Sequence, residues 1–205
     1  MTPPFLLNLP RLLSTMLVAL LLASCDTPKR GRTPTQYLDA FEPSSVPRTS
    51  SQVDTVSYWD GDAVAGPPSI VLNLTEQKAY FYKGGQLAGV SLICSGNETH
   101  TTVAGNFKIF QKDLDHKSNL YGDFVDSAGN IVKANVDITK DKAPPGSHFD
   151  GSKMHHFMRF NGGAGMHEGF MAGYPASHGC VRMPAQMATT FYNNVTLGTP
   201  VRVVP

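Results

Sequence analysis

Short alternations of apolar and polar residues begin near residue 69 and predict a domain made mostly of β-strands. Ile70, Leu72 and Leu74 alternate with other residues, and Lys78–Tyr82 follows after a turn. A Lys-Gly-Gly turn then leads into Leu87–Cys94. Strands of this length that are joined by short turns pair with their neighbours in the chain. We therefore expect a meander of three strands at the start of the domain.

Further strands and one helix are predicted downstream. The strand candidates share an apolar or alternating character and are Phe107–Phe110, Ile131–Ile138, Phe157–Phe160 and Val201–Val204. Convincing helical character is confined to Ala185–Asn193, which follows Pro184 and turns Met187, Ala188 and Phe191 toward the core. The predicted fold class is mostly β, an antiparallel sandwich or barrel with one or two short helices.

One long segment, Asp113–Ser152, is polar and short on strand pattern, although it includes the candidate strand Ile131–Ile138. It also contains the turn Pro144–Ser147. Long loops in a compact domain often cover a binding site. We therefore expect this segment to act as a lid.

The chain ahead of the domain has the pattern of an exported lipoprotein. Arg11 precedes the apolar run Leu12–Leu22, which is shorter than the roughly 20 residues of a membrane span. Residues 1–24 are therefore predicted to be a signal peptide. The sequence Leu22-Ala-Ser-Cys25 resembles the bacterial lipobox, in which the cysteine becomes the lipid-modified first residue. The alternative is an ordinary secretory signal with an incidental cysteine.

Lipid attachment at Cys25 would hold the protein on a membrane, on its periplasmic face, because several acyl chains anchor a protein firmly. Asp26 follows this cysteine and favours the inner membrane in some Gram-negative bacteria. Residues 25–66 are rich in Pro, Ser, Thr and Arg and are expected to form a flexible tether. Tyr58 and Trp59 are the exception, since an exposed tryptophan would be unusual there, and they are expected to dock on the domain that spans 67–205.

Composition narrows the possible partners. The formal net charge is +1 and the basic residues of the domain are dispersed, so nothing favours nucleic acid as a partner. Three cysteines are too few for a disulfide framework.

The adjacent His155 and His156 would point to opposite faces of a strand. The chain has neither His-x-x-x-His nor Cys-x-x-Cys spacing, so no metal site is expected. Nothing fixes the oligomeric state, and a monomer is expected.

The stretch from Gly165 to Pro184 carries the candidate chemistry. Cys180 directly follows Gly179 and His178, and His167 lies thirteen positions upstream across a glycine-rich segment. A neighbouring imidazole is the usual means of turning a thiol into a nucleophile near neutral pH. The backbone amides of Gly179 and Cys180 would suit an oxyanion. The pattern favours a Cys–His nucleophilic site over an inert buried cysteine.

These residues resemble a known family. The sequence Ser177-His-Gly-Cys-Val-Arg182, preceded by His167-x-Gly169, is similar to the signature of L,D-transpeptidase (YkuD-type) catalytic domains. Three more segments are similar to strands of that domain: Ile70–Tyr82, Gly105–Ile109 and Gly198–Val201. The likeness covers about residues 67–205. Two departures are the absence of proline in Thr101–Gly105 and a short His-to-Cys loop, typical of a compact branch.

The resemblance implies a role for each matching residue. Cys180 would be the nucleophile, and His167 the general base and proton donor, oriented by the backbone carbonyl of Glu168. His178 and Gly179 would line the site, with the Gly179 amide facing the oxyanion. Substrate binding is implied for three residues: Ser177, Arg182 and Tyr174. The segments Lys117-Ser118, Tyr121-Gly122 and Ser147–Phe149 would border the cleft. No cofactor and no metal are implied.

The activity implied is that of a peptidoglycan L,D-transpeptidase. Cys180 would be acylated by a tetrapeptide stem with release of D-alanine, and the acyl group would pass to an amine acceptor. With water as acceptor the same site would be an L,D-carboxypeptidase or another murein peptide hydrolase. Two other classes stay open: a non-catalytic wall-binding lipoprotein and a metal-binding one. Cys94 is expected to be a buried strand residue, and a disulfide to Cys180 would block the nucleophile.

Overall fold

The computed structural model describes residues 54–205. The predicted signal peptide, the lipid-attachment residue Cys25 and the tether up to residue 53 lie outside the described residues. Within 54–205, no helix is both long and apolar enough to cross a membrane.

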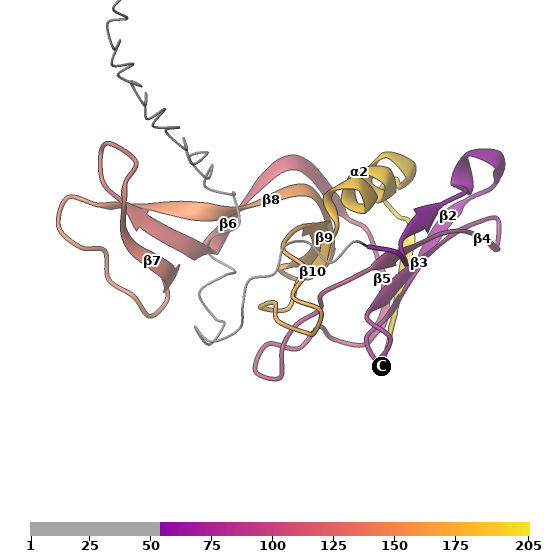
Figure 1. Cartoon of the computed structure of the whole chain (residues 1–205), viewed down its shortest axis with the longest axis horizontal. Helices are drawn as coiled ribbons and strands as arrows, with labels where there is room; N and C mark the ends of the chain where they lie inside the picture. The colour runs from indigo at the N-terminus through magenta and orange to yellow at the C-terminus, as the bar shows by residue number, and fades with distance from the viewer. Residues whose placement is uncertain (1–53) are drawn as a thin grey trace, which may run out of the picture. The chain divides into compact units, whose positions relative to one another are not determined.

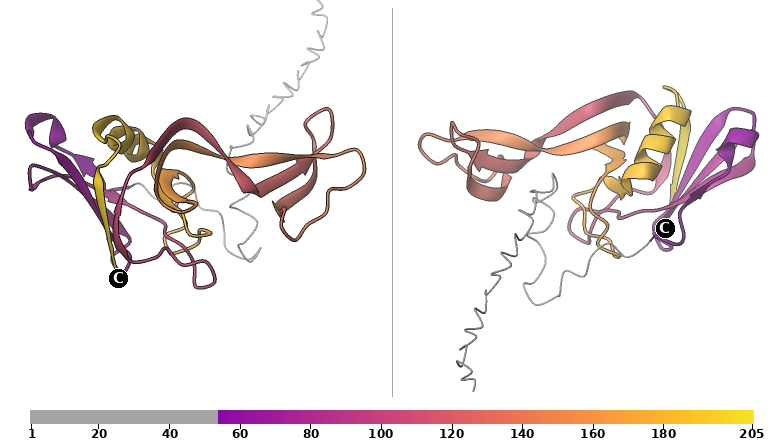
Figure 2. Two further views of the ribbon diagram at one scale, coloured as in Figure 1. Left: turned by 180° about the vertical axis from the view of Figure 1, so that it is seen from behind. Right: turned by 45° about the horizontal axis from the view of Figure 1, so that its top comes forward.

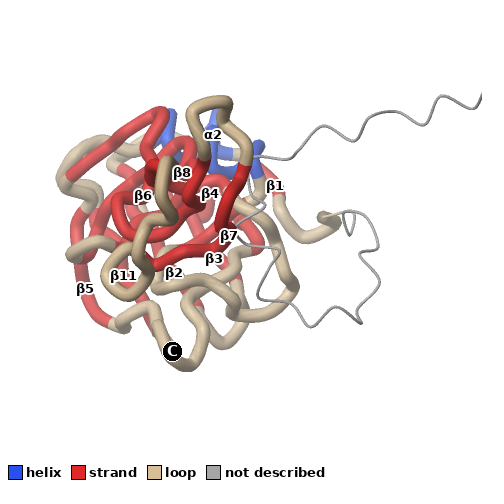
Figure 3. Tube along the Cα trace, turned by 90° about the vertical axis from the view of Figure 1, so that its left-hand side faces the viewer, coloured by secondary structure: helices blue, strands red, loops and turns tan. Residues whose placement is uncertain are grey.

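Strands dominate the domain, which confirms the predicted fold class (Figure 3). The first sheet has six strands in the order β1-β4-β3-β2-β11-β5. Their bounds are β1 Tyr58–Trp59, β2 Pro68–Asn73, β3 Lys78–Lys83, β4 Gln86–Leu92, β5 Gly105–Lys108 and β11 Pro200–Val204. The meander predicted from the sequence is β2, β3 and β4, which pair antiparallel in chain order.

The second sheet has five strands in the order β10-β9-β8-β6-β7. Their bounds are β6 Gln111–Val125, β7 Ile131–Asp137, β8 His148–Asn161, β9 Ala164–Glu168 and β10 Val181–Met183. Most pairs are antiparallel, but β9 with β10 and β2 with β11 are parallel. The helices are a 3₁₀ turn, η1 Gly61–Ala63, and α2 Ala185–Asn194.

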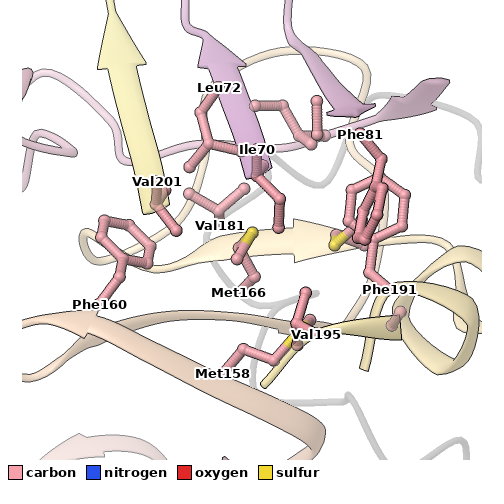
Figure 4. Packing of buried hydrophobic residues seen from close by; sticks show 14 of the residues in the cluster. Ile70, Leu72, Phe81, Met158, Phe160, Met166, Val181, Phe191, Val195 and Val201 are labelled. Carbon is pink, nitrogen blue, oxygen red and sulfur yellow. The ribbon is translucent and has the colours of Figure 1, made fainter. Parts of the chain in front are cut away.

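Apolar side chains from both sheets and from α2 meet in one core (Figure 4). Ile70 and Leu72 of β2 alternate with partly exposed neighbours, as expected for a strand with one buried face. Met166 and Val181 contribute from the second sheet. The sequence predicted that three side chains of α2 face the core. All three are buried: Met187, Ala188 and Phe191. The core thus lies directly behind β9 and β10.

The prediction of a polar loop at Asp113–Ser152 is wrong. Most of it is strand: β6, β7 and the first part of β8 form a long ribbon that runs out from β9, β10 and α2, with β7 at its far end (Figures 1 and 2). The middle of β6 is largely solvated on both faces, so the sequence there lacks the apolar alternation that identifies a half-buried strand. At the far end Phe124, Val125 and Val136 are buried, and the candidate strand Ile131–Ile138 is β7. The segments expected to border the cleft belong to this ribbon and to the loop between β7 and β8.

Trp59 docks on the domain, as the sequence predicted. Its strand β1 pairs with β4, and its ring meets the edges of Phe81 (centroids 5.1 Å apart) and lies 6.4 Å from that of Phe191. Such aromatic contacts bury large apolar areas. The folded domain therefore includes β1 and η1, within the stretch assigned to the tether.

Candidate active site

The strand pair β9–β10 sets the geometry of the site. The parallel register places Val181 opposite Met166 and Arg182 opposite His167. Val181 and Met166 belong to the core. Because side chains alternate between faces, His167 and Arg182 point to the other side of the sheet. Cys180 precedes β10 by one residue, so continuing the register places it opposite Gly165, on the face of His167 and Arg182.

A hydrogen bond fixes the tautomer of His167. Its Nδ1 lies 2.6 Å from the carbonyl oxygen of Glu168. A carbonyl can only accept, so Nδ1 carries the proton and Nε2 keeps its lone pair. The orienting bond expected from the sequence is therefore present. His167 is only 4% exposed, and this burial lowers its pKa to about 4, assisted by the charge of Arg182.

The pKa of the Cys180 thiol is shifted in the opposite direction, upward. Its residue is only partly exposed and burial raises its pKa, against smaller opposing effects of the Gly165 backbone and of Arg182 and Arg159. Burial disfavours the charged form of each group, so thiol and imidazole are both neutral at pH 7. A thiol that the imidazole has already ionised at rest does not fit these pKa directions.

The turn before Cys180 is held by buried hydrogen bonds. Ser177 is 1% exposed, and its hydroxyl donates to the carbonyl of Cys180, three residues on. Its amide donates to the carbonyl of Ser95 over 3.0 Å, and its carbonyl accepts from Asn97. Ser177 therefore holds the turn through its buried hydroxyl, and its predicted contact with substrate stays a prediction.

Gly179 has a backbone φ of +98°, a left-handed conformation that glycine adopts at little cost. Its amide donates to the Ser177 hydroxyl over 3.2 Å, and its carbonyl accepts from the Thr102 hydroxyl over 3.1 Å. The Gly179 amide predicted to face an oxyanion thus already has an internal acceptor, although a long one.

Arg182 ties the segment between β9 and Cys180 to the strands. Its guanidinium donates to the carbonyl of Ala176 over 3.0 Å, and Nη1 lies 4.0 Å from the sulfur of Cys94. Gly169 packs on its aliphatic part, where a Cβ would lie 2.9–3.0 Å from three of its carbons. Arg182 is 2% exposed and supports the loop, and its predicted contact with substrate stays a prediction.

Replacing Arg182 with methionine should loosen the loop 169–179. The partly buried carbonyl of Ala176 would lose its donor, which costs about 1 kcal/mol of unfolding free energy. Urea unfolding and the rate of proteolytic cleavage within the loop measure the effect. The control is Arg202→Met, because Arg202 is exposed on β11. Equal loop cleavage in both variants would contradict the supporting role.

His178 lies in a ring cluster above the turn. Its ring centroid is 4.6 Å from that of His100 and 4.5 Å from that of Tyr121, which belongs to β6. Burial and the nearby His100 lower the pKa of His178 to about 4. The cluster connects the catalytic turn to the ribbon, so Tyr121 borders the site.

Tyr174 lies in another neighbourhood. It is 46% exposed and, with Pro175, faces the turn Asn97–Thr99 across a hollow of about 510 Å³. Its carbonyl accepts from the thiol of Cys94 over 3.1 Å. Cys94 is fully buried, as predicted, but forms an isolated bridge to Arg182 just beyond β4. The predicted contact of Tyr174 with substrate stays a prediction.

A family model described as the YkuD L,D-transpeptidase catalytic domain matches residues 67–203. The chain belongs to this family. No curated protein that was compared matches it in sequence. The fold is shared with solved L,D-transpeptidases, and the strand framework that carries His167 and Cys180 is therefore the framework of a transpeptidase domain.

Three of these solved structures come from Enterococcus faecium, Mycobacterium smegmatis and Xylanimonas cellulosilytica. The first is 24% identical over 68% of this chain and 50% of its own, with a TM-score of 0.50. The second is 17% identical over 67% and 58%, and the third 20% over 69% and 62%, both also with a TM-score of 0.50. This L,D-transpeptidase domain thus spans 50–62% of those chains.

Several residues of the candidate site carry no motif in the sequence. Thr102 and His100 meet the turn from a distant segment, and Phe157 packs near the ring of His167, with centroids 6.2 Å apart. Only Arg159 has a local signal, as a charged residue within the apolar run Phe157–Phe160. Among residues 54–205, no three His, Cys, Asp or Glu side chains are placed to hold a metal ion.

Proposed function

We propose that the protein is a peptidoglycan L,D-transpeptidase in which Cys180 is the nucleophile and His167 the general base. The observation that carries this proposal is the parallel pairing of β9 and β10. Extending this register by one residue supports a position for Cys180 on the face of His167, whose imidazole is oriented by its bond to the Glu168 carbonyl. Family membership supports the choice of stem peptides as substrates.

The proton of the thiol moves during attack, because both groups rest in their neutral forms. As sulfur bonds to the carbonyl carbon next to the terminal D-alanine, the Sγ proton passes to Nε2 of His167 and the carbonyl electrons move onto oxygen. Collapse of this intermediate breaks the C–N bond. The imidazolium then gives its proton to the leaving amine, and a thioester remains on Cys180.

The second half-reaction repeats these steps with an acceptor. An amine of another stem attacks the thioester and gives its proton to His167. Collapse breaks the C–S bond, and the thiolate takes the proton back. The oxyanion of each intermediate is assigned first to the amide of Cys180, because the amide of Gly179 must first leave the Ser177 hydroxyl.

Incubation with a disaccharide tetrapeptide followed by mass spectrometry tests this function. We expect a covalent adduct on Cys180 that lacks one D-alanine, together with a cross-linked dimer. A tripeptide product without dimer would make the enzyme an L,D-carboxypeptidase. The absence of both adduct and products would refute the enzymatic function.

We also propose that the protein is anchored in the cell envelope by a lipid on Cys25, on the periplasmic side. The sequence pattern around this residue supports the anchor, and stem peptides are found in that compartment. Cys25→Ala should move the protein from the membrane fraction to the soluble fraction without changing its rate on soluble donors. Continued sedimentation with membranes would contradict the anchor.

A further inference from the structure

Arg159 shares a row of the second sheet with the nucleophile. It lies on β8 opposite Gly165 of β9, and the register of β10 continues this row to Cys180. The next row, Met158, Met166 and Val181, faces the core. Since side chains alternate, Arg159 projects to the catalytic face. Gly165 contributes no side chain to this row, and the ring of Phe157 occupies the space over it.

The guanidinium is fixed but its hydrogen-bonding capacity is not used up. Nη1 donates to the carbonyl of Gly162 over 3.2 Å, and the guanidinium carbon lies 5.1 Å from the centre of the Phe157 ring. Nε is buried and finds no acceptor among residues 54–205. No carboxylate within this described part of the chain forms an ion pair with Arg159. The guanidinium is a planar fork of five N–H donors, and one of them is bonded to the Gly162 carbonyl. Such a fork is suited to binding a carboxylate.

The surroundings hold this group in place. Phe157 is completely buried, with the ring of His116 stacked on it at a centroid distance of 4.1 Å. The same ring leans over Gly165, where a Cβ would come within 2.5 Å of it. Arg159 itself is only partly buried, so a ligand can reach it. Its charge also acts on the thiol of Cys180, which places the two within electrostatic reach.

We propose that Arg159 binds a carboxylate of the donor stem peptide and thereby selects donors that carry this group near the attacked carbonyl. The inference rests on the proposed function, because it assigns a substrate group to the same site. Two carboxylates have the required chemistry. One belongs to the terminal D-alanine that leaves, and the other to the side chain of the residue that is attacked, in stems that carry one.

Binding to the full-length Cys180→Ala protein tests this without requiring turnover. The probes are a tetrapeptide with both carboxylates, one amidated only at its C-terminus, and one amidated only on the side chain. We expect one of the two amides to bind about 10- to 100-fold more weakly than the parent peptide, as for loss of a charge-assisted hydrogen bond. That amide identifies the carboxylate.

Adding Arg159→Met should remove this preference, so that parent and amide bind equally, whereas Arg202→Met should preserve it. Arg159→Lys, which keeps the charge but loses the fork, should restore part of it. Equal binding of all three peptides, or a preference that survives in Arg159→Met, would overturn the inference. Turnover is measured separately: an inactive wild type that still discriminates through Arg159 would refute the proposed function alone.

The rate of iodoacetamide alkylation against pH separates substrate binding from an effect on the nucleophile. In a protein with Cys180 intact, Arg159→Met should leave the apparent thiol pKa close to that of the wild type. A large upward shift, with kcat/KM lowered equally for all three peptides, would assign Arg159 to the thiolate instead and overturn the carboxylate assignment.

Discussion

Replacing Cys180 with alanine should abolish the release of D-alanine from a tetrapeptide donor, with kcat/KM falling by about 10⁴–10⁶-fold, as for loss of other enzymatic nucleophiles. The neighbouring amides and His167 would remain, but no atom could form the acyl-enzyme. The measurement combines initial rates with intact-protein mass spectrometry, in which the acyl adduct should disappear.

The matched control is Cys94→Ala, the other cysteine of the described domain. Cys94 is fully buried beside Arg182, and its thiol donates to the Tyr174 carbonyl. This variant should still form the adduct and retain most of the activity. An adduct that persists in Cys180→Ala but disappears in Cys94→Ala would move the nucleophile to the buried thiol.

Removing the imidazole of His167 should have the second largest effect. His167→Ala should lower kcat/KM by about 10²–10⁴-fold, the usual contribution of a general base. His155→Ala serves as control, because that histidine is partly exposed on β8 and pairs with Asp115. Undiminished activity in His167→Ala would transfer the role of base to His178.

The pH dependence of kcat/KM follows from the lowered pKa of His167. The base must be neutral, and its pKa of about 4 means that kcat/KM should hold from pH 7 to 5 and fall as the pH approaches 4. An acid limb near 6.5, the ordinary histidine value, would contradict the burial argument. Alkylation of Cys180 should rise toward alkaline pH without a plateau near pH 6, since its thiol pKa is raised.

The same burial makes the fold sensitive to acid. Between pH 6.5 and 4 the unfolded chain binds a proton on His167 that the folded chain does not, so the free energy of unfolding falls as pH decreases through this range. A lowering from 6.5 to about 4 corresponds to roughly 3 kcal/mol. His178 shifts in the same direction and adds to the trend. His167→Ala should therefore reduce the slope of stability against pH.

Short segments of the sequence were enough to predict some secondary-structure elements and the two candidate catalytic residues. The alternation around Ile70 and Leu72 predicted β2, and the spacing of Met187 and Phe191 predicted α2, because one face of each element is buried. The spacing of His167 and Cys180 gave the candidate nucleophile and base. These inferences needed no knowledge of how distant segments pack.

The rest depended on contacts between distant segments. The middle of β6 is solvated on both faces and lacks the alternation of a half-buried strand, whereas β7 was predicted from Ile131–Ile138. The parallel pairing of β9 with β10 requires the loop to cross over, a topology that residue spacing does not specify. The buried states of Ser177 and Arg182 follow from Ser95, Cys94 and Ala176, which close around them only in the folded domain.

The docking of Trp59 would have a mechanical consequence under the lipid anchor that we propose on Cys25. Among the strands of residues 54–205, tension from that end would reach β1 first. This strand lies at the outer edge of the first sheet, and the ring of its Trp59 packs near Phe81 and Phe191. His167 and Cys180 lie on the other sheet. Pulling would therefore peel a two-residue strand before it strained the strands that align nucleophile and base.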